Sequence, residues 1–74
     1  MINSLKKARI QAGYKTATDA IYKFGWKASV YRAHESGSLE YDIETAITYA
    51  KAYGVSLSYL GFDEQQSADK IIDN

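Results

Sequence analysis

The sequence predicts an all-α fold, a compact bundle of five short helices. Apolar residues recur at helical spacing in five successive segments of the 74-residue chain. Each segment is bounded by a residue that can cap a helix N-terminus or by a glycine suited to a helix C-terminus. No segment alternates apolar and polar residues over a useful length, so we expect no β-sheet.

The first predicted helix begins near the N-terminus and ends at Gly13. Ser4 or Asn3 is its candidate N-cap, because a short polar side chain satisfies the unpaired N–H groups of the first turn. The residues expected on its inner face are Leu5, Ala8, Arg9 and Ala12.

The second predicted helix lies between Thr16 and Gly25. Thr16 and Asp19 stand at capping-box spacing, which places a hydroxyl and a carboxylate to satisfy N–H groups reciprocally. The inner face is expected to carry Ala17, Ala20, Ile21 and Phe24, which recur at i, i+3, i+4 and i+7.

A tight turn at Gly25-Trp26 joins this helix to a third one, which ends at Gly37. Gly25 can adopt the left-handed conformation that ends a helix. Two helices joined by so short a turn cross at a steep angle, so the third helix is expected to protrude from the body. Its expected packing residues are Val30, Tyr31 and His34.

A loop then leads to Asp42, the predicted N-cap of a fourth helix that ends at Gly54. Its inner face is expected to carry Ile43, Ala46, Ile47, Ala50 and Tyr53. Ser56 is the candidate cap of a short fifth helix, whose apolar anchors are Leu57 and Leu60. We therefore expect one domain over residues 1–62, followed by a polar, flexible tail over residues 63–74.

The composition excludes several classes of protein. The chain has no cysteine and one histidine, so disulfides, cofactor chemistry and a metal site built from this chain alone are not expected. No carboxylate pair, nucleophile–base arrangement or glycine-rich phosphate loop stands out, so we do not expect an enzyme or a small-molecule substrate. No apolar run approaches membrane-spanning length, which predicts a soluble cytoplasmic protein without membrane contact.

The net charge of zero conceals a strong asymmetry. Residues 1–37 contain seven basic and two acidic residues, a net charge of +5, whereas residues 38–74 contain two basic and seven acidic residues, a net charge of −5. Such polarity can steer one face toward phosphates. The alternative is two ordinary solvated faces whose charges differ by chance.

With this helix order in place, the chain resembles the helix-turn-helix domains of lambdoid phage repressors and Cro proteins, the XRE-like family. The resemblance extends from Leu5 to Phe62. The matching positions are Leu5, Ala8-Arg9, Gly13, Ala20-Ile21, Phe24-Gly25, Tyr31, His34-Glu35, Gly37 and the block from Ala50 to Leu57.

This resemblance implies that the second and third helices form a helix-turn-helix and that the third lies in the major groove of duplex DNA. The positions implied to face bases or nearby phosphates are Lys27, Ala28, Ser29, Arg32 and Ala33. The start of the second helix implies a phosphate site with Lys15, Thr16 and Thr18. Alternatively, Arg32 is a solvated helix arginine and Thr16 serves only as a cap.

The resemblance also implies structural and assembly contacts. Arg9 and Glu35 match a partly buried salt bridge between the first and third helices. His34 matches an aliphatic core position, which favours a packed, hydrogen-bonded histidine over a ligand or switch. A homodimer is expected, with apolar contacts from Tyr59, Phe62, Ile71 and Ile72 and from Tyr53, although Tyr53 and Tyr59 can instead belong to the core.

Two features depart from the family pattern. The loop from Ser38 to Asp42 is acidic where relatives are often basic, so it is expected to contribute little to phosphate binding. Ile21 occupies a position usually held by alanine, which can shift the angle between the two helices.

The leading functional hypothesis is therefore a sequence-specific DNA-binding transcriptional regulator, a phage- or prophage-type repressor or Cro-like factor. The alternative is a protein-interaction module of the same fold, such as an antitoxin or a repressor partner, with little DNA binding.

Overall fold

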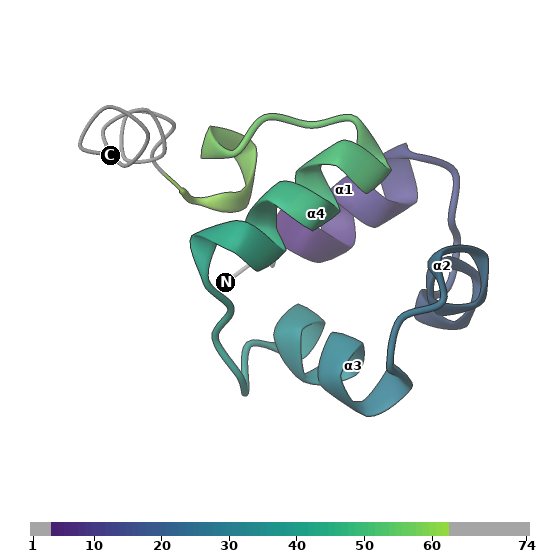
Figure 1. Cartoon of the computed structure of the whole chain (residues 1–74). Helices are drawn as coiled ribbons and strands as arrows, with labels where there is room; N and C mark the ends of the chain where they lie inside the picture. The colour runs from purple at the N-terminus through teal and green to yellow at the C-terminus, as the bar shows by residue number, and fades with distance from the viewer. Residues whose placement is uncertain (1–3, 63–74) are drawn as a thin grey trace.

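The computed structural model describes residues 4–62. In this range all regular secondary structure is helical, and turns and loops connect the helices. The elements are α1 (Ser4–Gln11), α2 (Ala17–Phe24), α3 (Ala28–Ser36), α4 (Ile43–Tyr53) and the 3₁₀ turn η1 (Ser58–Leu60) (Figure 1). The all-α prediction is confirmed over this range. The predicted fifth α-helix is a single 3₁₀ turn of three residues.

The first helix is the central packing element. α1 contacts α2, α3, α4 and η1, and α2 additionally contacts α3. Figure 1 shows α1 and α4 crossing at the centre of the molecule, with α2 and α3 on the periphery. The core cluster joins all five elements through Leu5, Ala8, Ala20, Tyr31, Tyr49, Ala50, Tyr53 and Leu60.

Aromatic side chains fill much of this small core. Tyr53 lies edge-on to Phe24 at 6.0 Å and to Trp26 at 5.9 Å between ring centroids, and Tyr49 lies edge-on to Tyr31 at 5.5 Å. Such edge-to-face pairs add to the stabilisation that apolar burial provides. Large rings compensate for the limited number of buried residues in a chain of this length.

Both ends of α4 and the start of η1 follow the predicted local signals, whereas Ser4, a candidate N-cap, already lies within α1. Asp42 accepts a hydrogen bond from the Thr45 backbone N–H at 3.0 Å, and Ser56 accepts one from the Tyr59 N–H at 3.1 Å. Gly54 ends α4 in the left-handed conformation, with a φ of 68°. Capping therefore stabilises these short elements at the residues predicted to act as caps.

Three inner-face assignments differ from the prediction. Ala12 is exposed because α1 ends at Gln11 and Ala12 already lies in the turn. Val30 is 37% exposed because Tyr31 and His34 define the buried direction of α3 and leave Val30 at its edge. Tyr49, which the apolar pattern omitted, is buried.

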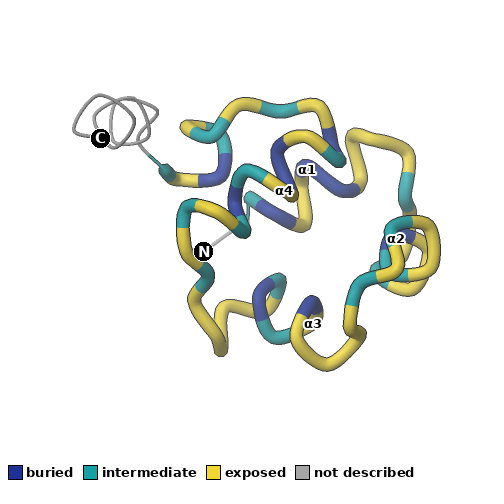
Figure 2. The backbone as a smooth tube through the Cα atoms, viewed as in Figure 1, coloured by how far each residue is buried: buried dark blue, intermediate teal, exposed yellow. Residues whose placement is uncertain are grey.

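The buried segments of α1, α3 and α4 face one another, while much of the outer surface is exposed (Figure 2).

The predicted tail over residues 63–74, including Ile71 and Ile72, and the candidate cap Asn3 lie outside the described residues. Among residues 4–62, no helix has the length and apolar character required to cross a membrane.

Candidate nucleic-acid interface

The first turn of α2 forms an exposed polar surface behind a helix cap. The Thr16 hydroxyl accepts a hydrogen bond from the Asp19 backbone N–H at 3.1 Å, which is one of the two bonds of the predicted capping box. Lys15, Thr16 and Thr18 are all exposed here. A helix N-terminus with nearby hydroxyls and a cation offers the donors and positive potential that favour a phosphate.

The turn after α2 is fixed by its backbone conformation. Gly25 has a φ of 73°, and the Ile21 carbonyl accepts hydrogen bonds from the N–H groups of Gly25 at 2.8 Å and Trp26 at 3.2 Å. A Cβ at Gly25 would meet open space. The left-handed φ, rather than lack of room, therefore favours glycine here.

Trp26 packs between the two helices that this turn connects. Its ring stacks on Phe24 at 4.6 Å and on Tyr31 at 5.1 Å between centroids, with interplanar angles of 23° and 16°. Phe24 is the last residue of α2, and Tyr31 lies in α3. The indole thus helps to fix the relative orientation of α2 and α3.

The inner side of α3 is bonded to α4. The hydroxyl oxygens of Tyr31 and Tyr53 are 2.6 Å apart, and His34 Nδ1 lies 2.7 Å from the Tyr49 hydroxyl oxygen. His34 is only 8% exposed, so the structure confirms a packed, hydrogen-bonded histidine. These contacts fix which side of α3 faces inward.

Burial shifts the pKa values of this inner network in the direction that favours the uncharged side chains. It raises the pKa of Tyr31 far above its ordinary value, and the hydrogen bonds to Tyr53 and Glu35 raise it further. Burial likewise raises the pKa of Tyr49 and of Tyr53 to about 12. Burial lowers the pKa of His34, and the negative charge of Asp42 partly opposes that shift.

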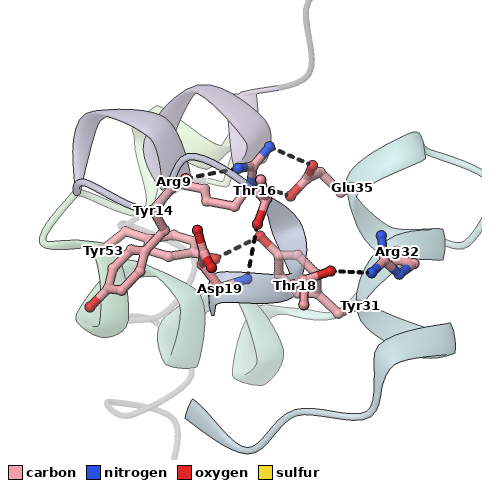
Figure 3. A network of polar contacts seen from close by, with 9 residues as sticks. All are labelled: Arg9, Tyr14, Thr16, Thr18, Asp19, Tyr31, Arg32, Glu35 and Tyr53. Atoms are coloured by element: carbon pink, nitrogen blue, oxygen red, sulfur yellow. Dashed lines mark hydrogen bonds and ion pairs between the residues drawn. The ribbon is translucent and has the colours of Figure 1, made fainter. Parts of the chain in front are cut away.

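A salt bridge holds α3 against α1 (Figure 3). Arg9 donates from Nε to one Glu35 carboxylate oxygen at 3.0 Å and from Nη2 to the other at 3.1 Å. Arg9 Nη1 also donates to the Tyr14 carbonyl at 2.8 Å. The two side chains are only 4% and 12% exposed, so this is the partly buried pair that the resemblance implied.

The opposite side of α3 is open. Lys27, Ala28, Ser29 and Arg32 are exposed, and Ala33 is partly buried. With 3.6 residues per turn, positions 29, 32 and 33 lie on the side of the helix away from Tyr31 and His34, and Ala28 is exposed at the first position of α3. We call this largely exposed surface the α3 outer face and define it by those five residues.

One contact joins the α3 outer face to α2. Arg32 Nη2 donates a hydrogen bond to Thr18 Oγ1 at 2.7 Å, with both side chains exposed (Figure 3). The sequence predicted these two residues as DNA contacts separately, one at a phosphate and the other over bases. The structure brings them into direct contact across the two helices.

The acidic loop between α3 and α4 has a structural use. Asp42 supplies the cap of α4, while Glu40 and Leu39 are exposed. The negative charge at Asp42 is therefore explained by helix capping, and nothing in this loop supplies a cation for a phosphate.

Sequence reasoning missed one prominent side chain near these residues. Tyr22 is 90% exposed, four positions after Thr18 on the same face of α2. The helical spacing from Thr18 was the signal that could have identified it.

Tyr59 and Phe62, the predicted dimer contacts, are half-buried, while Tyr53 is buried in the core.

Potential metal-ligating side chains do not cluster in the part of the chain that the structure describes. No group of three or more histidine, cysteine, aspartate or glutamate side chains is placed to hold a metal ion among these residues. The chain matches no protein-family model, no curated protein and no solved structure.

Proposed function

We propose that this protein is a sequence-specific DNA-binding transcriptional regulator, in which α2 and α3 act as a helix-turn-helix. The observation that carries the proposal is the open α3 outer face, whose opposite side is bonded to α1 and α4. A rigidly mounted, exposed helix with cationic and small side chains suits the major groove, which accommodates an α-helix.

The side chains of this face match the chemistry of base edges. The Arg32 guanidinium can form two hydrogen bonds to guanine, and the Ser29 hydroxyl can donate or accept. Ala28 and Ala33 are small enough to contact a thymine methyl group. Lys27, at the start of α3, is suited to a phosphate or a guanine.

The start of α2 would bind the DNA backbone. Lys15 supplies a positive charge, and the Thr16 and Thr18 side chains lie beside the helix N-terminus. Phosphate contacts of this kind position a protein on the duplex, whereas base contacts provide sequence preference.

The proposed regulator is a phage- or prophage-type repressor or a Cro-like factor that occupies an operator without chemistry of its own. One small domain reads few base pairs, so we propose a two-fold dimer on half-sites about 34 Å apart. Tyr59 and Phe62 remain the proposed dimer contacts among the described residues, together with Ile71 and Ile72 from the tail.

Selection from a random-sequence duplex pool at two salt concentrations tests the DNA-binding proposal. The unmodified protein should enrich a motif and lose affinity as salt rises, because phosphate contacts release counterions. Lys27→Ala and Arg32→Ala should weaken binding. The matched control is Lys51→Ala, which removes an exposed cation from α4. Absence of any enriched motif, with salt-independent affinity, rejects the proposal.

A second candidate is a protein-interaction module of the same fold. The net charge of −5 over residues 38–74 and the 90% exposed Tyr22 favour it. In that case Lys27→Ala and Arg32→Ala leave biological activity intact, whereas substitutions at Tyr59 or Ile71 abolish it. The same substitutions therefore separate the two functions.

A further inference from the structure

The hydrogen bond between Arg32 and Thr18 restricts an exposed arginine at the centre of the α3 outer face. An arginine in solvent samples many rotamers, and fixing it on DNA costs conformational entropy. Here Nη2 is already bonded to Oγ1 at 2.7 Å in the protein alone. The guanidinium is thereby oriented before any DNA is bound.

Thr18 is well suited to this orienting role. Its side chain branches at Cβ, which restricts χ1 in a helix. It lies in the first turn of α2, two residues after the Thr16 cap, and the Trp26 ring packs against both α2 and α3. The acceptor oxygen is therefore held at a defined place relative to α3.

The bond leaves the guanidinium able to recognise a base. Arginine has five N–H donors, and each of the two N–H groups on Nη2 belongs to a different two-pronged edge of the guanidinium. Whichever of them Thr18 accepts from, the other edge keeps both of its donors. The O6 and N7 acceptors of guanine fit such an edge.

We propose that Thr18 is a positioning residue that orients Arg32 for recognition of guanine in the major groove. This inference rests on the proposed DNA-binding function and assigns it a base and a second residue. Thr18 accepts from Arg32 through an oxygen whose own hydrogen can donate to a phosphate. The hydroxyl thereby links the proposed contact of α2 with the DNA backbone to the proposed contact of α3 with a base.

The test compares base preference rather than affinity alone. Random-pool selection with the unmodified protein identifies the motif. The same selection with Arg32→Ala identifies the position of the motif at which the preference for guanine is lost. Binding is then measured on duplexes with guanine or adenine at that position. Arg32→Ala should reduce the guanine preference by about 5- to 150-fold, the range for a two-bond arginine–guanine contact.

Thr18→Val and Thr18→Ser form the matched pair of variants. Valine keeps the shape and branching of threonine but lacks the hydroxyl, so it should reduce the guanine preference by roughly two- to tenfold, as expected for one lost hydrogen bond. Serine keeps the hydroxyl and should retain most of the preference. Thr18 is exposed, so both variants should fold, and circular dichroism with thermal unfolding verifies this.

A modified base identifies the acceptor on the DNA. Replacing the guanine by 7-deazaguanine removes N7 and should weaken binding by the unmodified protein but not by Arg32→Ala. Equal binding of the two duplexes by the unmodified protein overturns the guanine assignment. A Thr18→Val protein with the full guanine preference overturns the role of Thr18 while leaving the proposed function intact, whereas failure of the unmodified protein to select any motif rejects both.

Discussion

Among single residues, Arg9 has a large part in holding α3 in position. Its guanidinium binds both oxygens of Glu35 and also the Tyr14 carbonyl, which lies in the turn before α2. One side chain thus joins α1, the α1–α2 turn and α3. Its burial makes the balance of charges around it important for stability.

Glu35→Ala should lower the free energy of unfolding by about 3–5 kcal/mol, because it leaves the Arg9 charge buried without its partner. Urea denaturation measures the change. The matched control, Glu40→Ala, removes an exposed acid and should change stability by less than about 0.5 kcal/mol. Similar values for the two variants would show that the ion pair does not support the fold.

His34 should make stability depend on pH. Burial lowers the pKa of His34 below its ordinary value of 6.5, so the unfolded chain binds more protons than the folded one as the pH falls through this range. The contribution of His34 is therefore complete above about pH 6.5 and is lost as the pH falls toward the folded-state pKa.

Unfolding free energies between pH 7.5 and 5.5 test this effect, in a range above most carboxylate titrations. The unmodified protein should become less stable on acidification, and His34→Gln should show a weaker dependence. Asp42 opposes the pKa shift, and the Tyr49 hydroxyl bonds the ring. Parallel pH profiles for the two proteins would contradict the assignment to His34.

At the scale of the elements, α2 and α3 are too short to be stable alone. They contain 8 and 9 residues, below the length at which isolated helices persist in water. Their orientation depends on the Gly25 turn, the Trp26 ring stack and the bonds from α3 to α1 and α4. The turn is therefore where a local change should alter the arrangement most directly.

Gly25→Ala should destabilise the protein by about 1–2 kcal/mol, the cost of placing an L-residue in the left-handed conformation. Thermal or urea unfolding measures the loss. Gly25→Asn should be less harmful, because asparagine tolerates this conformation better. Since the Cβ position is open, an equal loss for the two variants would contradict a conformational origin.

For the whole molecule, charge polarity matters more than net charge. Residues 1–37 carry +5 and residues 38–74 carry −5, and the described elements of the basic half include α2 and α3. The proposed interface thus lies in the half with positive potential. The acidic half would favour one orientation of the protein on DNA.

The salt dependence of binding should report both the interface and the assembly. If Lys15, Lys27 and Arg32 each displace one counterion, the slope of log Kobs against log salt is about −2.7 for one chain and about −5.4 for a dimer. Fluorescence anisotropy titrations measure the slope, and sedimentation of the complex gives the number of chains. A slope near zero would contradict the electrostatic part of the proposal.

Sequence alone determined where most helices begin and end. Thr16, Asp42 and Gly25 act on backbone groups within a few residues, so their effects are visible in local sequence. The helical spacing of apolar residues also identified core positions such as Leu5 and Ala20. The last element was overestimated because Leu57 and Leu60 satisfy helical spacing although the chain completes only a 3₁₀ turn.

Only the tertiary structure decided which side chains meet across the helices. The burial of Tyr49, its bond to His34 and the contact between Thr18 and Arg32 join residues 14 or 15 positions apart. Such contacts depend on helix packing angles and ring orientations, which the spacing of residues along one helix does not specify. The same packing leaves the α3 outer face open, because tyrosine and histidine side chains hold the other side of that helix against the core.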